Sequence, residues 1–141
     1  MEHMRYKDPE IYRIVEAEKE RIENTIDLIA AENHATPSIL EAQGSAFKMK
    51  AAEGYPGHRF HAGCGLADDL ESLTIKRGKK LFGAEHINVQ PHSGTAANLA
   101  AYFSVLKPGD RILAMKLSHG GHLSHGDKAS ITSQCFQFSH Y

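Results

Sequence analysis

The chain has 141 residues, of which 41% are hydrophobic and 23% are charged, and its formal net charge is −1. This composition is typical of a globular protein with one compact core. The near-neutral charge gives no electrostatic reason to expect a nucleic-acid or membrane partner, and no apolar run approaches the roughly 20 residues of a membrane helix. Because the N-terminal residues lack the apolar core of a signal peptide, we expect a cytoplasmic protein.

Cysteine and histidine spacing argues against a metal site. Cys64 and Cys135 lie far apart and are expected to be reduced thiols. His119, His122 and His125 recur at a spacing of three, but no carboxylate or cysteine stands close to them and a Gly-Gly pair interrupts any helical face. A metal protein is therefore the least favoured interpretation.

The first part of the chain predicts helices. Asp8-Pro9 is typical of an N-cap followed by a first-turn proline, and the apolar residues after it mark one face of a long helix reaching Ile29. Thr36-Pro37 repeats this start signal for a second helix that carries Phe47.

An irregular segment comes next. Residues 53–65 are rich in glycine and predict a loop of unusual conformation. Leucines from Leu66 to Leu81 then predict a third helix, which Gly83 ends.

The remaining sequence predicts alternating strands and helices. Residues 86–90 and 111–117 are expected to be strands flanking a helix at 94–106, which makes a right-handed βαβ unit, and residues 134–138 predict one more short strand. A parallel sheet with exposed edges normally continues further. The chain is therefore expected to be the front part of a larger α/β fold.

The turn Ser93-Gly94-Thr95 lies between a predicted strand and a helix. Two hydroxyls and the free N–H groups of a first helical turn can bind a phosphate. Neither the P-loop pattern nor the dinucleotide glycine fingerprint is present, and these three residues alone favour an ordinary serine N-cap over a phosphate site.

Two further segments carry candidate chemistry. Residues 116–126 follow a strand at the sheet edge where α/β folds place ligands, so an imidazole there can stack on an aromatic ligand, although a structural turn is the simpler interpretation. Glu53 is a candidate proton-transfer group with Arg59 as its possible ion-pair partner, whereas a lone glutamate is more often a surface charge.

Taken together, these segments resemble the serine hydroxymethyltransferase family, pyridoxal-phosphate enzymes of one-carbon metabolism. The resemblance spans nearly the whole chain. It is carried by Leu28-Ile29-Ala30-Ala31-Glu32-Asn33, Glu41-Ala42-Gln43-Gly44-Ser45, Glu53-Gly54-Tyr55-Pro56-Gly57, Leu81-Phe82-Gly83-Ala84-Glu85, Gln90-Pro91-His92-Ser93-Gly94, Leu106-Lys107-Pro108-Gly109-Asp110 and His119-Gly120-Gly121-His122-Leu123.

The resemblance implies a fold-type I pyridoxal-phosphate-dependent transferase of the α/β class. A helical N-terminal arm would cover residues 1–52, and residues 53–141 would form the first, incomplete part of the large domain. The implied reaction is hydroxymethyl transfer between serine and glycine with tetrahydrofolate as cosubstrate. The implied partners are an amino-acid substrate and either a second copy of the chain, in a homodimer or larger oligomer, or a complementary C-terminal chain.

The resemblance also implies roles for single residues. By the family's motifs, the cofactor phosphate is bound by Ser93, Gly94 and Thr95, the pyridine ring stacks on His122, and Glu53 transfers a proton near the substrate hydroxymethyl group. The folate is faced by Leu117, Gly121 and Leu123.

Three positions depart from the family's pattern. Ala31, Ala51 and His61 stand where the family usually has a serine and two tyrosines. Each replacement removes a hydroxyl aimed at the ligand, although His61 can serve as a hydrogen-bond donor or an acid–base group. A related aldolase or transaldolase acting on another β-hydroxy amino acid is therefore an alternative, and a non-catalytic interaction module is a second one.

The family's Schiff-base lysine and carboxylate-binding arginine belong to later parts of its sequence. Lys48, Lys50 and Lys116 do not stand in the family's lysine motif. We therefore expect the chain to act within a complete protein or with a missing C-terminal half, and to be inactive by itself.

Overall fold

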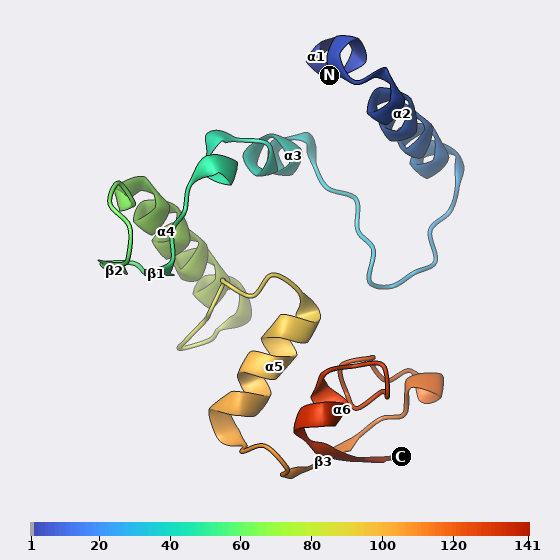
Figure 1. Ribbon diagram of the computed structural model, residues 1–141, viewed down its shortest axis with the longest axis vertical. Coiled ribbons are helices and arrows are strands. Elements are labelled where there is room, and N and C mark those ends of the chain that lie inside the picture. The colour runs from blue at the N-terminus through green and yellow to red at the C-terminus, as the bar shows by residue number, and fades with distance from the viewer. Residues whose placement is uncertain (1) are drawn as a thin grey trace. The chain divides into compact units, whose positions relative to one another are not determined.

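A computed structural model describes residues 2–141. The chain divides into two compact units, the first ending at Lys50 and the second running from Ala51 to Tyr141 (Figure 1). Both helices and strands are present, which confirms the predicted mixture of α and β structure. No helix within residues 2–141 is both long and apolar enough to cross a membrane.

The first unit is helical. Its elements are α1 (Glu2–Lys7), α2 (Pro9–Asn24), α3 (Pro37–Gln43) and the short 3-10 helix η1 (Ala46–Met49). Asp8 caps α2 as predicted, because its Oδ1 accepts a hydrogen bond of 3.1 Å from the backbone N–H of Ile11.

The first long helix ends earlier than its apolar pattern predicts. It stops at Asn24 instead of reaching Ile29, and the next residue, Thr25, is extended. The side chains of Asn24 and Thr25 hydrogen-bond to carbonyls of the preceding turn, and Asp27 accepts the N–H of Ile29. These local bonds compete with continued helix, which explains the early end.

The first unit has no core of its own. None of residues 2–50 is buried, and the apolar face of α2, including Ile11, Ile14 and Ile22, is exposed. An apolar face of this kind marks a surface that packs against other protein.

The second unit opens with a hairpin and a long helix. Strands β1 (Gly54–Tyr55) and β2 (His58–Arg59) pair antiparallel within the predicted loop. Helix α4 (Gly65–Phe82) follows and ends as predicted at Gly83, which adopts the left-handed conformation with φ 62°.

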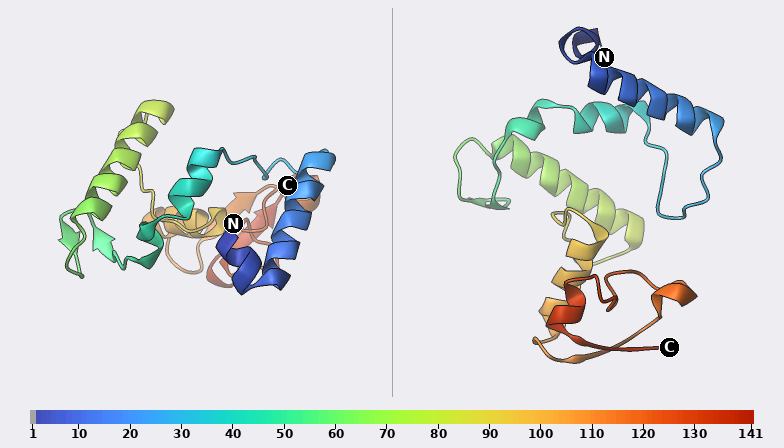
Figure 2. Two further views of the ribbon diagram at one scale, coloured as in Figure 1. Left: turned by 90° about the horizontal axis from the view of Figure 1, so that it is seen from above. Right: turned by 45° about the vertical axis from the view of Figure 1, so that its right-hand side comes forward.

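The rest of the second unit is built around α5 (Gly94–Val105). The other elements are β3 (Arg111–Ala114), the 3-10 helix η2 (Leu117–His119), α6 (Thr132–Cys135) and β4 (Gln137–His140). Strands β3 and β4 pair in parallel, from Arg111 with Gln137 to Ala114 with His140. Figure 2 gives two further views of these elements.

The prediction of a βαβ unit is wrong for its first strand. Residues 86–90 form no strand within residues 2–141, and β3 pairs instead with β4. The backbone N–H of Gln90 donates to the side-chain Oδ1 of Asn88 at 2.9 Å, so this segment satisfies part of its own hydrogen bonding locally. The strands predicted at 111–117 and 134–138 are also displaced, since β3 ends at Ala114 and α6 precedes β4.

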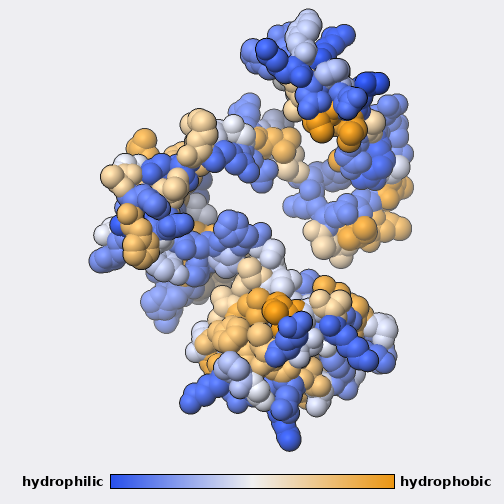
Figure 3. All heavy atoms as spheres, in the orientation of Figure 1, coloured by the Kyte–Doolittle hydropathy of each residue, from blue (hydrophilic) through white to orange (hydrophobic). Residues whose placement is uncertain are grey.

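Aromatic side chains join α5 to the C-terminal strand. The Tyr102 ring lies 5.6 Å from that of Phe136 and 6.0 Å from that of Phe138, and the Phe103 ring lies 5.1 Å from that of Phe136. Of these rings Phe136 is buried, as is Ala114 at the end of β3. Figure 3 shows apolar residues gathered on the visible surface of this part of the unit. Val105 of α5 and Leu113 of β3 are exposed.

Candidate functional site

The N-terminus of α5 is open to a ligand. Ser93 is its N-cap, with Oγ 3.2 Å from the N–H of Ala96 and the backbone oxygen 3.0 Å from the N–H of Ala97. The N–H groups of Gly94 and Thr95 have no partner within residues 2–141. A side chain at Gly94 would meet nothing within 4 Å, so the space outside this turn is free. The turn can therefore donate two N–H groups and two hydroxyls to an anion.

Two glycines shape the histidine loop beside β3. Gly120 has φ 102°, a conformation that favours glycine, and a Cβ at Gly121 would collide with the backbone oxygen of Met115. The loop thereby turns back on the end of β3 and presents His122 with an exposed ring. Its Nδ1 is 2.6 Å from the Oγ of Ser124 and 3.1 Å from the N–H of the same residue.

The loop's histidines have different contacts. The His122 and His125 rings meet edge to face at 5.8 Å, and the Nδ1 atoms of His119 and His125 bond to the backbone oxygen of Tyr141 and the hydroxyl of Tyr102. Across residues 2–141, no three His, Cys, Asp or Glu side chains gather as metal ligands do.

Glu53 makes its contact with His61. The Nε2 of His61 lies 3.1 Å from the Oε2 of Glu53, and their side chains are 44% and 75% exposed. His61, which stands where the family usually has a tyrosine, therefore contacts Glu53, the candidate proton-transfer group. An imidazole here can donate a hydrogen bond to the carboxylate or exchange a proton with it.

Arg59 is not the partner of Glu53, which corrects the expected ion pair. Its side chain is only 6% exposed and pairs with two carboxylates of α4, at 2.7 Å to Asp68 and 2.6 Å to Glu71. The hairpin register explains the difference. The carbonyl of Glu53 accepts the N–H of Phe60 at 3.1 Å, while the Arg59 side chain lies against the helix.

Arg59 instead holds the backbone on both sides of Glu53. Its Nη1 donates to the carbonyls of Ala52 at 2.6 Å and Gly54 at 2.9 Å. The side-chain amide of Gln90 also donates to the Gly54 carbonyl, at 2.8 Å. The position of Glu53 is therefore fixed by a network that the sequence motifs did not indicate.

This network shifts the acidity of its members. A hydrogen bond from the Gly57 N–H, followed by one from Arg59, lowers the pKa of Asp68 below its ordinary value. Hydrogen bonds to Asp68 and Glu71 raise the pKa of Arg59 above its already high value. The only available signal in the sequence was the spacing of Asp68 and Glu71, which puts two carboxylates on one face of α4.

The remaining candidate residues lie on exposed surface of the same loop. Leu117 and Leu123 are half-exposed and Gly121 is partly buried. Leu117 and His122 line one open pocket, to which Lys128 and His140 also contribute. No hydrogen bond within residues 2–141 joins Ser93, Gly94 or Thr95 to His122 or Glu53.

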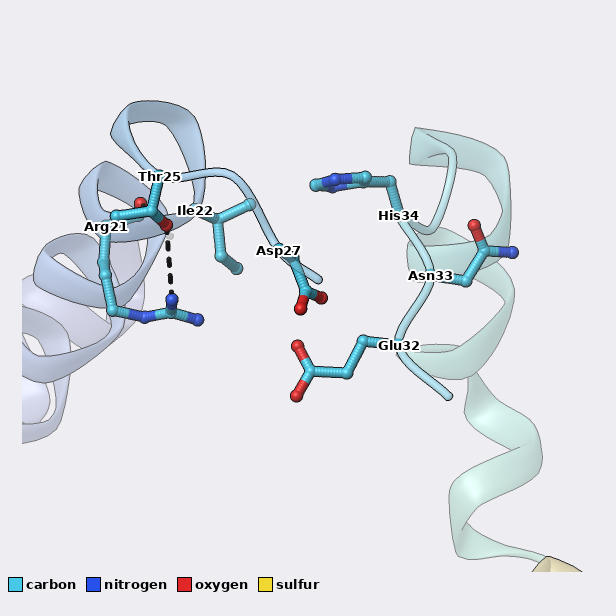
Figure 4. Close-up of a pocket in the computed structure, with 7 residues that line it drawn as sticks. All are labelled: Arg21, Ile22, Thr25, Asp27, Glu32, Asn33 and His34. Carbon is cyan, nitrogen blue, oxygen red and sulfur yellow. Dashed lines mark hydrogen bonds between the residues drawn. The ribbon is translucent and has the colours of Figure 1, made fainter. Parts of the chain in front are cut away.

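A separate small pocket lies in the first unit, between the end of α2 and residues 32–34. Figure 4 shows the carboxylates of Asp27 and Glu32 pointing toward each other, with Arg21 bonded to Thr25 nearby. A hydrogen bond with Asp27 raises the pKa of Glu32, and a hydrogen bond from the Ile29 N–H lowers that of Asp27. The two carboxyl groups therefore have pKa values shifted in opposite directions.

A model of the family described as Serine hydroxymethyltransferase matches residues 4–141. The chain belongs to the serine hydroxymethyltransferase family. It is 54% identical over 140 residues to the serine hydroxymethyltransferase of Halorubrum lacusprofundi, covering 99% of this chain and 34% of that relative. It is 53% identical to that of Dehalococcoides mccartyi over 141 residues, covering 100% of this chain and 34% of the relative.

A third serine hydroxymethyltransferase, from Methylobacillus flagellatus, is 54% identical over 134 residues, which are 95% of this chain and 32% of that protein. The chain therefore spans about a third of the length of the curated serine hydroxymethyltransferases that it matches.

Proposed function

We propose that this chain, joined to the remaining part of a serine hydroxymethyltransferase sequence, carries out pyridoxal-phosphate-dependent hydroxymethyl transfer between serine and glycine with tetrahydrofolate. The observation that carries the proposal is the family match over residues 4–141, which includes the open turn at the start of α5. On this proposal the second unit is the first part of a fold-type I large domain, preceded by a helical arm.

The open turn suits the cofactor phosphate. A phosphate needs several donors and positive potential, and the first turn of the 12-residue helix α5 offers unpaired N–H groups, two hydroxyls and the positive end of the helix dipole. We assign phosphate binding to Ser93, Gly94 and Thr95. When bound, pyridoxal phosphate supplies an electron sink for bonds broken at the substrate α-carbon, while the protein orients it and moves protons.

His122 suits the role of a stacking partner. Its ring is exposed, yet Nδ1 is tied to Ser124, so the imidazole plane is held without covering its face. Near His122 in the sequence are Leu117, Gly121 and Leu123, and we assign these three residues to folate binding. Exposed leucine side chains beside a small glycine can pack against a flat ring system.

Glu53 and His61 suit proton transfer. We assign to Glu53 the proton exchanged near the substrate hydroxymethyl oxygen, and to His61 the hydrogen bond that orients this carboxyl group. Arg59 keeps the backbone of residues 52–54 in place during that exchange. General acid–base catalysis of this kind contributes about 10²- to 10⁴-fold to rate.

A second candidate reaction is aldol cleavage of another β-hydroxy amino acid without folate. It is favoured by Ala31, Ala51 and His61, because three ligand-directed hydroxyls of the family's pattern are missing. A hydrogen bond to a charged group contributes about 1.5–3 kcal/mol, so their combined loss would lower activity toward the usual substrate.

The proposal extends to assembly. The exposed apolar faces of α2 and of the second unit support packing against further protein, either the remaining part of the sequence or a second copy.

The reaction can be tested by co-expressing this chain with the C-terminal two-thirds of the Halorubrum lacusprofundi relative. The purified pair is supplied with pyridoxal phosphate, and glycine formation from serine is measured with and without tetrahydrofolate. Folate-dependent glycine formation supports the proposed transfer. Folate-independent cleavage of other β-hydroxy amino acids supports the second candidate, and a pair with neither activity contradicts both.

A further inference from the structure

One face of α5 contacts a serine and a histidine of the loop. Asn98 and Tyr102 are four residues apart, so they lie on the same side of the helix. The Nδ2 of Asn98 donates to the Oγ of Ser124 at 2.7 Å, and the Tyr102 hydroxyl bonds to the Nδ1 of His125. The helix whose N-terminus is the proposed phosphate site therefore also anchors the loop that carries His122.

The contacts of Ser124 determine where the proton of His122 resides. A backbone N–H can only donate, so the 3.1 Å contact from the Ser124 N–H requires the Nδ1 of His122 to be an acceptor. A neutral imidazole that accepts at Nδ1 carries its proton at Nε2. Nε2 has no hydrogen-bond partner within residues 2–141.

The Ser124 hydroxyl reinforces this tautomer. Ser124 is fully buried at 0% exposure, so its hydroxyl bonds only to its protein neighbours. Because the Asn98 amide donates to Oγ, the single hydroxyl proton is directed to the Nδ1 of His122, 2.6 Å away. The three side chains form a directed relay, Asn98 to Ser124 to His122.

We propose that Asn98 and Ser124 are positioning residues that fix His122 as the neutral Nε2–H tautomer in one ring orientation. The inference deepens the proposed function and rests on it for the purpose of that orientation. A neutral ring of fixed plane stacks on the cofactor ring without first losing rotational freedom or carrying a positive charge toward it. Its Nε2–H remains available to donate to a ligand oxygen.

The tautomer is measurable before any cofactor is added. The assembled protein described above is labelled with ¹⁵N-histidine, and long-range ¹H–¹⁵N correlation spectra are recorded without pyridoxal phosphate, with the His122 signals assigned by their loss in His122→Gln. We expect the Nε2–H form of His122 to exceed the Nδ1–H form by about tenfold, as one directed hydrogen bond provides. A predominant Nδ1–H form overturns the inference.

Asn98→Asp keeps the shape of the side chain but reverses the direction of its hydrogen bond with Ser124. A carboxylate only accepts, so the Ser124 hydroxyl turns toward it and its lone pairs face His122. We expect the Nε2–H excess to fall several-fold, whereas the matched control Ser118→Ala, at an exposed serine of the same loop, leaves it unchanged. An unchanged excess in Asn98→Asp overturns the inference.

Ser124→Ala gives an independent variant if Asn98→Asp folds poorly. It removes the hydroxyl while keeping the backbone N–H, and we expect the dissociation constant of pyridoxal phosphate to rise about 3- to 10-fold, with no change in Ser118→Ala. An unchanged constant in Ser124→Ala overturns the positioning role. Failure of the unaltered protein to bind pyridoxal phosphate, with the Nε2–H tautomer present, contradicts the proposed function and leaves the tautomer assignment supported.

Discussion

Ser93 has two roles that different substitutions separate. Its Oγ caps α5, and the same hydroxyl is assigned to the cofactor phosphate. Ser93→Ala is expected to lower the free energy of unfolding by about 1 kcal/mol through loss of the cap. Ser93→Gly is expected to lower it by only about 0.3 kcal/mol. Thermal or denaturant unfolding of the assembled protein measures this difference.

Both Ser93 variants lack the hydroxyl, so both are expected to bind pyridoxal phosphate more weakly than the unaltered protein, by about 3- to 10-fold. Cofactor titration followed by absorbance measures the dissociation constants. Unchanged affinity in the stable Ser93→Gly variant would show that the serine is only a helix cap.

His61 tests whether the departure from the family's pattern is functional. Because its pair with Glu53 is largely exposed, His61→Ala is expected to lower kcat by only about 2- to 5-fold. His61→Tyr restores the hydroxyl of the family's pattern and should retain more activity. Glu53→Gln is expected to lower kcat by about 10²-fold or more. Steady-state kinetics of the assembled protein measure all three, and equal rates for His61→Ala and the unaltered protein would remove His61 from the site.

At the scale of elements, alanine variants of two glycines distinguish the cost of backbone strain from the cost of a steric collision. Gly126 and Gly109 have nearly equal φ angles of 89° and 92°. A Cβ at Gly126 would collide with the Phe138 ring, whereas one at Gly109 would meet nothing within 4 Å. Both alanine variants share a backbone penalty of about 1–2 kcal/mol, and Gly126→Ala should lose about 1–3 kcal/mol more.

Equilibrium unfolding of the two variants within the assembled protein gives that difference directly. Equal losses in Gly126→Ala and Gly109→Ala would contradict the packing of β4 against the histidine loop.

The hairpin and α4 are expected to be acid-sensitive through Asp68. Its pKa is lowered on folding, so the stability it contributes is present above its ordinary pKa of about 3.9 and is lost as pH falls through the lower folded value. Asp68→Asn should therefore flatten the acid side of a plot of unfolding midpoint against pH. The adjacent, exposed Asp69→Asn removes the same charge and should leave that slope intact.

The sequence predicted those elements whose signals are local. The start of α2 at Asp8-Pro9, the end of α4 at Gly83 and the range of α5 each depend on a cap or on periodicity within one segment. Residues 86–90 failed as a strand because a strand also needs a partner, which apolar alternation does not specify.

The sequence did not predict the contacts of the site that join distant segments of the chain. The partners of Arg59 lie on α4, and Asn98 reaches Ser124 across 26 positions, so no local motif contains either network. Candidate residues such as Ser93 and His122 lie within family motifs, whereas the positioning residue Asn98 lies far from His122 in the sequence.

At the scale of the whole molecule, the chain exposes more apolar surface than its buried core can balance. Only Cys64, Ala114 and Phe136 are buried apolar residues within residues 2–141, and the matched relatives are about three times longer. We therefore expect the isolated chain to bind a hydrophobic dye and to unfold without a sharp transition. Joining it to the remaining sequence should abolish dye binding and produce a cooperative transition; an isolated chain that already unfolds cooperatively would contradict this expectation.

Cofactor retention shows directly whether the α5 turn binds pyridoxal phosphate. The assembled protein is mixed with pyridoxal phosphate, passed through gel filtration, and its visible absorption spectrum is recorded beside that of the Ser93→Gly variant. We expect a yellow, protein-bound cofactor that co-elutes with the unaltered protein, and less of it with the variant. A folded assembly that elutes colourless would contradict the assignment of the α5 turn as a pyridoxal-phosphate site.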